Sequence, residues 1–164
     1  MLKSKPAEKN RELTMLKAVI DTNVAVSALL SPSGNSAQII DCIFEEELKP
    51  FFCEKIFAEY TSVLARPRFR FSAEDQAHVI MGIKKYGEQT EPIPYDALFS
   101  DESDQIFFEV AKTAGAYLVT GNTKHFPDEP FVINPAECVE LLSTMKESAA
   151  IQNGRSSSSN SKPT

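Results

Sequence analysis

Side chains that could hold a cation occur at four separated points of the chain. Asp21 and Asn122 each follow a short apolar run of the kind that forms a buried strand. Glu59 lies inside a segment with helical spacing, and Asp104 lies at the beginning of another. Carboxylate and carbonyl oxygens are the ligands that hard divalent cations prefer. If the fold brings these four residues together, they form a candidate metal site.

Each of these residues taken alone has a simpler explanation. An acid after a strand, such as Asp21, often begins a loop or caps the next helix. Asp104 would stabilise the dipole in the first turn of a helix, and a helical glutamate such as Glu59 is usually solvated. Glu59, however, follows Ile56 by three positions and precedes Tyr60, which places it at the edge of an apolar stripe. The hypothesis of a metal site therefore rests on the combination of the four positions.

The elements that would position these residues alternate between strand and helix. Strands are expected at 16–20, 49–53, 89–94, 116–120 and 131–133, and helices at 24–30, 37–48, 54–65, 72–86, 101–115 and from 134 onward, with Ser36, Ser72 and Asn134 as caps. Such alternation predicts an α/β fold of three layers, α/β/α, with a central, mainly parallel sheet. In open sheets of this class, ligands bind at the carboxyl ends of the strands.

The length and composition predict one domain between two poorly structured ends. Residues 1–15 are basic and low in apolar content, so we expect a flexible arm. The folded domain should occupy 16–148, and the serine-rich residues 149–164 should form a disordered tail.

The cysteine content and the hydropathy predict a cytoplasmic protein. The three cysteines, Cys42, Cys53 and Cys138, are odd in number and lack the C-x-x-C spacing of zinc sites. No segment has the roughly 18 apolar residues of a membrane span, and the N-terminus lacks the apolar core of a signal peptide.

The net charge limits the mode of any nucleic-acid binding. A charge of −6 with a pI of about 5.0 argues against binding through a broadly basic face. It remains compatible with an acid-rich site, because a bound cation supplies local positive charge.

Four motifs surround the candidate ligands. They are Val19-Ile20-Asp21-Thr22-Asn23-Val24, Glu59-Tyr60 running into Leu64-Ala65-Arg66-Pro67-Arg68-Phe69, Asp101-Glu102-Ser103-Asp104 with Phe107-Phe108 and Ala111, and Val119-Thr120-Gly121-Asn122. In this order and spacing they resemble a PIN domain, and more narrowly the toxin components of toxin–antitoxin systems akin to VapC toxins. The resemblance covers about residues 16–146.

This resemblance implies a metal-dependent ribonuclease whose acids hold one or two Mg²⁺ or Mn²⁺ ions. Asp21, Glu59 and Asp104 match the first three acids of the family. The fourth position is usually Asp and is Asn122 here, which can coordinate through its carbonyl oxygen but brings no charge. We expect this change to weaken metal affinity, most of all for a second ion.

The chemistry of phosphodiester hydrolysis suggests a role for each site residue. A cation polarises the phosphoryl oxygen and lowers the pKa of the attacking water. We expect Asp21 and Asp104 to be direct ligands of the cation, and Glu59 to be a further ligand or a base acting through water. Asn122 and Thr120 are expected to position water. Asn23 and Asp101 are expected to be supporting residues, with Asp101 capping its helix.

The basic residues and the histidines are candidates for contact with RNA or for exposure at the surface. Arg66, Arg68, Arg70 and Lys124 could contact an RNA backbone, although basic residues beside a helix end are often simply solvated. His78 and His125 are expected to be surface or loop residues rather than a catalytic pair.

Two other classes of protein also use an acid near their first strand, and both require a second acid. A phosphatase of the haloacid dehalogenase type also has a strand ending in Asp, but it needs a second Asp two residues later, where this chain has Asn23. Receiver domains need an acidic pair near the first strand, which is missing. The stronger alternative is a PIN-like module, impaired by Asn122, that binds RNA or protein without cutting.

As a toxin, the protein would have RNA as its substrate and a cognate antitoxin as its partner, and would form a homodimer.

Overall fold

The computed structural model describes residues 14–96, 99 and 101–157, with side chains to 154. A five-stranded sheet lies at its centre, with the strand order β3-β2-β1-β4-β5 and every neighbouring pair parallel. The strands are β1 (Leu16–Ile20), β2 (Leu48–Phe52), β3 (Glu88–Gln89), β4 (Tyr117–Val119) and β5 (Val132–Ile133). The parallel sheet predicted from the sequence is confirmed.

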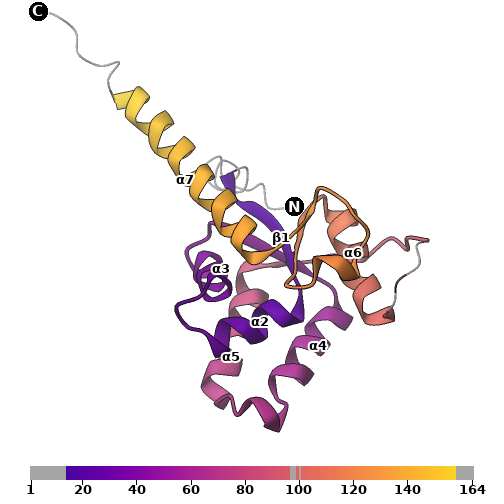
Figure 1. Ribbon diagram of the computed structural model, residues 1–164. Coiled ribbons are helices and arrows are strands. Elements are labelled where there is room, and N and C mark those ends of the chain that lie inside the picture. Colours follow the sequence, from indigo (N-terminus) through magenta and orange to yellow (C-terminus); the bar gives the residue numbers. More distant parts are fainter. Residues whose placement is uncertain (1–13, 97–98, 100, 158–164) are drawn as a thin grey trace, which may run out of the picture.

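Helices cover the sheet and complete a three-layer α/β/α fold (Figure 1). They are α2 (Thr22–Leu30), α3 (Asn35–Phe44), α4 (Glu54–Leu64), α5 (Ala73–Tyr86), α6 (Glu102–Ala114) and α7 (Pro135–Ser157), with two 3-10 turns, η1 (Pro67–Phe69) and η2 (Thr123–His125). Figure 1 also shows that the last turns of α7 extend beyond the rest of the molecule.

The central strand β1 determines where the site lies. Ala18, Val19 and Ile20 are fully buried, as expected for a strand that has parallel neighbours and helices on both faces. The hydroxyl of Tyr60 in α4 donates a hydrogen bond to the carbonyl of Ile20. This contact fixes α4 against the carboxyl end of β1, where the chain continues into Asp21.

Side-chain caps begin three of the helices. Ser72 accepts a hydrogen bond from the Asp75 N–H at 3.0 Å, as predicted. Asn134 and Glu137 cap each other's backbone N–H groups at 2.8 and 3.1 Å, which is a capping box at the beginning of α7. The third cap, at Asp101, belongs to the site described below.

The predicted bounds of two elements were wrong. The helix expected over 37–48 begins at Asn35 with Gly34 at its N-cap, so Ser36 is not the cap, and it ends at Phe44. Glu46, with φ 57°, adopts a left-handed conformation that a helix cannot continue through. The strand expected over 89–94 pairs only at Glu88 and Gln89, because the prolines that follow cannot donate to a ladder.

The C-terminal boundary also differs from the prediction. Helix α7 continues to Ser157, so residues 149–157 are helical rather than a disordered tail. Ala149, Ala150 and Gln152 are good helix formers, and no proline interrupts the segment. Residues 158–164 and most of the predicted arm, 1–13, lie outside the described residues.

Candidate functional site

The site begins where the two central strands end side by side. Ile20 of β1 pairs with Val119 of β4, and the Asp21 N–H donates to the Val119 carbonyl at 2.9 Å. The residues that follow these strands therefore meet. Thr120, which is fully buried, donates its hydroxyl proton to Asp21 Oδ2 at 2.7 Å.

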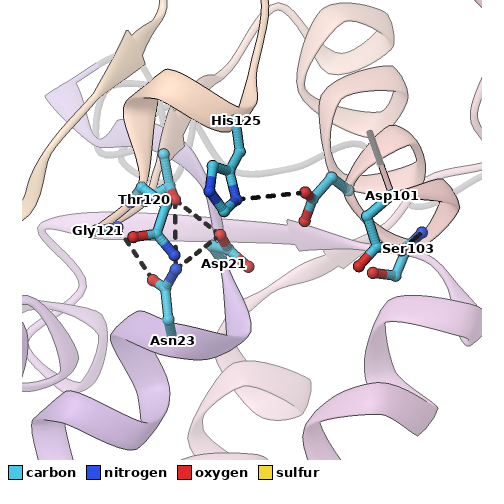
Figure 2. A network of polar contacts seen from close by, with 9 residues as sticks. Asp21, Asn23, Asp101, Ser103, Thr120, Gly121 and His125 are labelled. Atoms are coloured by element: carbon cyan, nitrogen blue, oxygen red, sulfur yellow. Dashed lines mark hydrogen bonds and ion pairs between the residues drawn. The ribbon is translucent and has the colours of Figure 1, made fainter. Parts of the chain in front are cut away.

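Asn23 ties this pair to the loop after β4. Its Nδ2 donates to Asp21 Oδ2 at 3.1 Å and reaches Thr120 Oγ1 at 3.5 Å, and its Oδ1 accepts from the Gly121 N–H at 3.0 Å (Figure 2). The Asn122 N–H donates to Thr120 Oγ1 at 3.0 Å. The carboxylate of Asp21 is therefore oriented by two polar side chains.

Glu59 reaches the same region from α4. Its Oε2 accepts a hydrogen bond from Thr22 Oγ1 at 3.1 Å, and Thr22 directly follows Asp21. Glu59 is half-buried rather than fully solvated. Its position at the edge of the apolar stripe of α4 thus turns it toward the end of β1.

Asp104 approaches from the beginning of α6. Asp101 is the N-cap, and its Oδ1 accepts from the Ser103 N–H at 3.0 Å. Asp104 Oδ2 lies 3.9 Å from Nδ1 of His125, which belongs to η2. Figure 2 shows the ring of His125 turned toward this end of α6. His125 is exposed, as predicted, but it lies against an acid of the site, which the sequence did not indicate.

The electrostatics of the three acids are coupled. Burial raises the pKa of Asp21, and the charge of Asp104 raises it further, while the hydrogen bond from Thr120 opposes the change. Burial also raises the pKa of Glu59, with additional repulsion from Asp21 and Asp104. The pKa of Asp104 is raised by burial and by Asp101, and His125 lowers it. The fold therefore brings carboxylates together at a cost that a cation would relieve.

These acids do not form a closed cage. Among the described residues, the group of three side chains whose potential ligand atoms all lie within 4.8 Å of one another is Cys42, Glu45 and Glu47, around the end of α3 and the loop before β2. Asp21, Glu59 and Asp104 are arranged more openly. This arrangement fits Mg²⁺, which usually keeps several waters and binds through one or two carboxylates.

The other predicted residues occupy positions around these acids. Asn122 is exposed at the beginning of η2, and Lys124 is exposed within it. Arg66 and Arg68 are exposed in the turn after α4, apart from the hydrogen-bonded group of Asp21, Asn23 and Thr120. His78 stacks on Phe44, with ring centroids 4.3 Å apart, so it does not pair with His125.

Comparison with known proteins assigns the fold to a family. The model of the PIN domain matches residues 17–124, a span that runs from β1 into η2 and includes Asp21, Glu59, Asp104 and Asn122. The chain belongs to the PIN domain family. PIN domains have a nuclease-type fold and are generally metal-dependent nucleases.

One curated relative also matches this PIN domain. It is an uncharacterized protein of Methanocaldococcus jannaschii, 30% identical over 114 residues, which are 68% of this chain and 74% of the relative. No solved structure matches the chain. The resemblance to the PIN family is thus confirmed, whereas the narrower resemblance to VapC-like toxins stays a prediction.

Two residues near the acids were missed by the sequence analysis. Thr22 positions Glu59, and its signal was its place directly after Asp21. His125 contacts Asp104, but it lies 21 residues further along the chain, so no local spacing connected the two.

Proposed function

We propose that this PIN domain is a metal-dependent endoribonuclease that hydrolyses RNA phosphodiester bonds. Asp21, Glu59 and Asp104 would hold Mg²⁺ or Mn²⁺. The observation that carries the proposal is the convergence of three carboxylates, from the end of β1, α4 and α6. Burial raises the pKa of all three, and the charge of Asp104 raises the pKa of Asp21 and of Glu59 further. Perturbed acids at the carboxyl edge of a parallel sheet are typical of catalytic sites.

The side chains of the chain itself have distinct roles in this proposal. A bound divalent cation supplies a Lewis acid for the phosphoryl oxygen and lowers the pKa of water. Thr120 and Asn23 hold Asp21 Oδ2 by hydrogen bonds, so the direction of this carboxylate is fixed before substrate binds. Thr22 engages Glu59 Oε2, which leaves Oε1 to accept a proton from the attacking water.

Asn122 replaces the acid expected at the fourth position. Its amide can offer a carbonyl oxygen or position water, but it adds no negative charge to the site. Asp101 supports the beginning of α6 as its cap and adds negative charge near Asp104. Lys124, which is exposed two residues after Asn122, is proposed to contact the RNA backbone.

The test is cleavage of a mixed pool of structured and single-stranded RNAs by purified protein with Mn²⁺ or Mg²⁺. Parallel reactions contain EDTA, or the variants Asp21→Asn and Asp104→Asn. We expect cleavage that requires metal and disappears in both variants. Equal cleavage by wild type and variants would indicate a contaminating nuclease, and that result or the absence of cleavage would contradict the proposal.

A second candidate function is an RNA- or protein-binding module. The observation that favours it is Asn122, because one carboxylate fewer weakens the hold on a cation. RNA binding that persists in EDTA, without cleavage in any metal, would support this alternative.

The biological setting is also part of the proposal. We propose that the protein is the toxin of a toxin–antitoxin pair, acts in the cytoplasm, forms a homodimer and is inhibited by an antitoxin that covers the acids. Its cysteines are free and buried, which fits a reducing compartment. No described helix is long and apolar enough to cross a membrane. Induced expression should arrest growth, Asp21→Asn should not, and sedimentation velocity should give the mass of a dimer.

A further inference from the structure

A short basic turn joins α4 to α5 beyond the acids. We call residues 66–71 the arginine turn, in which three arginines alternate with a proline and two phenylalanines: Arg66, Pro67, Arg68, Phe69, Arg70 and Phe71. All three arginines are exposed, and within the part of the chain that the structure describes none of them forms an ion pair. The turn is thus a local positive patch on a protein of net charge −6.

Backbone hydrogen bonds hold the arginine turn in one shape. The Phe69 N–H donates to the Arg66 carbonyl at 3.1 Å, and the Arg70 N–H donates to the Pro67 carbonyl at 3.2 Å. Arg70 itself adopts a left-handed conformation, with φ 55°. From α5, Gln76 Nε2 donates to the Phe71 carbonyl at 2.9 Å. The arginines are therefore presented on a structured turn.

A stacked column holds one guanidinium in place. Phe71 packs against the hydrophobic core, and Phe69 stacks on it with ring centroids 5.3 Å apart and planes 7° from parallel. The guanidinium of Arg68 lies 4.7 Å from the centroid of Phe69. RNA-binding proteins use aromatic rings and guanidinium planes to stack unpaired bases, and arginines to bind phosphates. The arginine turn combines both kinds of group.

The arginine turn follows the helix that forms one wall of a cleft beside Glu59. A cleft of about 660 Å³ lies between α4 and α6, and its lining includes Glu59 and Ser103. On the α4 side, its lining residues Lys55, Ala58, Glu59 and Ser62 follow helical spacing, and Arg66 comes two residues after Leu64, where α4 ends. At 1.5 Å per residue, the end of α4 at Leu64 lies roughly 8 Å beyond Glu59, and the arginine turn begins two residues later. Figure 1 shows this connection between α4 and α5 on the side away from the projecting end of α7.

We propose that the arginine turn is a docking site for single-stranded RNA. Arg66 and Arg70 bind phosphates of the strand, and one unpaired base stacks on Arg68. The inference rests on the proposed ribonuclease function for the position of the scissile bond, because the strand passes from the cleft at Glu59 to the turn. The binding itself needs no metal and no cleavage.

The test measures binding without chemistry. A fluorescein-labelled oligoadenylate of about ten nucleotides is titrated in EDTA at several KCl concentrations, and its anisotropy is recorded. In the double variant Arg66→Ala, Arg70→Ala, we expect weaker binding and a slope of log affinity against log salt that is smaller by about 1.4, since each single-strand phosphate contact contributes about 0.7.

A second comparison separates stacking from charge. Arg68→Lys keeps the charge and loses the planar group, so we expect the salt slope to stay the same while affinity for oligoadenylate falls at least about fivefold, the lower end of what one stacked base contributes. An oligonucleotide with abasic sites should bind the wild type and Arg68→Lys equally. Circular dichroism establishes that each variant is folded.

The matched control is Lys112→Ala. Lys112 lies over the ring of Tyr95, 3.8 Å from its centroid, so its loss also removes one cation and one cation–π contact. It lies near the C-terminal end of α6, whereas Asp104 lies in the first turn. We expect its RNA affinity and salt slope to match those of the wild type.

Failure of this inference can be distinguished from failure of the proposed enzyme function. Arginine variants that bind RNA as the wild type does, while cleavage still depends on Asp21, would overturn the inference alone. Arginine variants that lose RNA binding in a protein that never cleaves RNA would support the inference and contradict the enzyme. Loss of affinity for a polyglutamate peptide with unchanged RNA binding would mean a protein-docking surface, and would overturn the RNA inference.

Discussion

Asp21 is the most constrained acid of the site. The residue is 7% exposed, and its Oδ2 accepts hydrogen bonds from Thr120 and Asn23. These bonds offset only part of the cost of burial, since the pKa of Asp21 remains raised. The position is therefore arranged to orient a carboxylate at some expense to stability, as is common at functional sites.

Replacing Asp21 by Asn should stabilise the metal-free protein. Because the folded state raises the pKa of Asp21, its ionised form is less favourable in the fold than in the unfolded chain, and an amide removes this cost. We expect the free energy of unfolding at pH 7 in EDTA to rise by about 1 kcal/mol. Urea denaturation measures it. Thr120→Val removes a hydrogen-bond donor from the carboxylate, so it should lower the free energy of unfolding. An Asp21→Asn variant less stable than the wild type would contradict this prediction.

Restoring an acid at Asn122 should strengthen metal binding. Asn122→Asp adds a negative charge at the residue whose N–H donates to Thr120 Oγ1, where the resemblance to PIN domains predicts an acid. We expect the Mn²⁺ concentration for half-maximal cleavage to fall several-fold, and calorimetric titration of Mn²⁺ to show tighter binding. Asn122→Ser, which adds no charge, is the control. Unchanged metal affinity in Asn122→Asp would show that this position lies outside the metal site.

Two buried thiols should resist alkylation. Burial raises the pKa of both Cys42 and Cys138 to about 12. At pH 8 only about one in ten thousand such thiols is ionised, against about a quarter at the ordinary value of 8.5. We expect iodoacetamide to modify them, by mass spectrometry, only after unfolding. Because the folded pKa exceeds the unfolded one, their contribution to stability is constant below about pH 8 and decreases as the pH rises toward 12. Rapid alkylation of the native protein would contradict their burial.

At the scale of elements, the sheet and its helices meet closely at the end of α5. Gly87 ends α5, and a Cβ built there would lie 2.6 Å from the carbonyl oxygen of Pro50 in β2 and 2.4 Å from that of Ile83. Both neighbours are backbone atoms, which cannot rotate away. This contact sets the distance between α5 and β2, and β3 follows immediately.

Gly87→Ala should therefore destabilise the fold. We expect a loss of about 2 kcal/mol, typical of an overpacked contact, measured as a lower urea midpoint with an unchanged m-value. Gly154→Ala in α7 is the matched control, because a Cβ there meets nothing within 4 Å. This variant should be neutral or slightly more stable, since alanine favours helix over glycine. Equal effects of the two substitutions would argue against the close approach.

At the scale of the whole molecule, charge is distributed unevenly. The chain has a net charge of −6, and three carboxylates converge at the end of β1. In contrast, three exposed arginines, at positions 66, 68 and 70, lie together after α4. An acidic site needs a cation before it can accept a phosphate, and a basic turn nearby compensates for the general repulsion of RNA. Binding of substrate and of metal should thus be coupled through the field of the protein.

Divalent metal should stabilise the folded protein through these acids. A ligand that binds only the native state raises stability with its concentration, by about 2.7 kcal/mol at one hundred times its dissociation constant. We expect Mn²⁺ to raise the melting temperature of the wild type, but not of Asp21→Asn. Glu45→Gln tests the separate group of Cys42, Glu45 and Glu47, and it should keep the full shift. If Mn²⁺ raised the melting temperature of Asp21→Asn but not that of Glu45→Gln, the metal would bind near the loop before β2 rather than at the end of β1. That result would contradict the proposed site.

The sequence by itself determined the elements and the family. Apolar runs and helical spacing are local signals, so β1, α4, α6 and the caps at Ser72 and Asn134 were predicted from neighbouring residues, and the order of four motifs indicated a PIN domain. Boundaries set by one left-handed residue, Glu46, or by the helical propensity of 149–157 were missed.

Only the tertiary structure decided which side chains meet. The bond from Thr120 to Asp21 joins residues 99 positions apart, because parallel pairing of β1 with β4 aligns the two strand ends. Likewise, Thr22 reaches Glu59 across 37 positions, and His125 reaches Asp104 from a different element. The spacing of residues in the sequence predicts contacts within one helix or strand. Contacts between elements depend on strand order and packing, which one amino-acid sequence does not show directly.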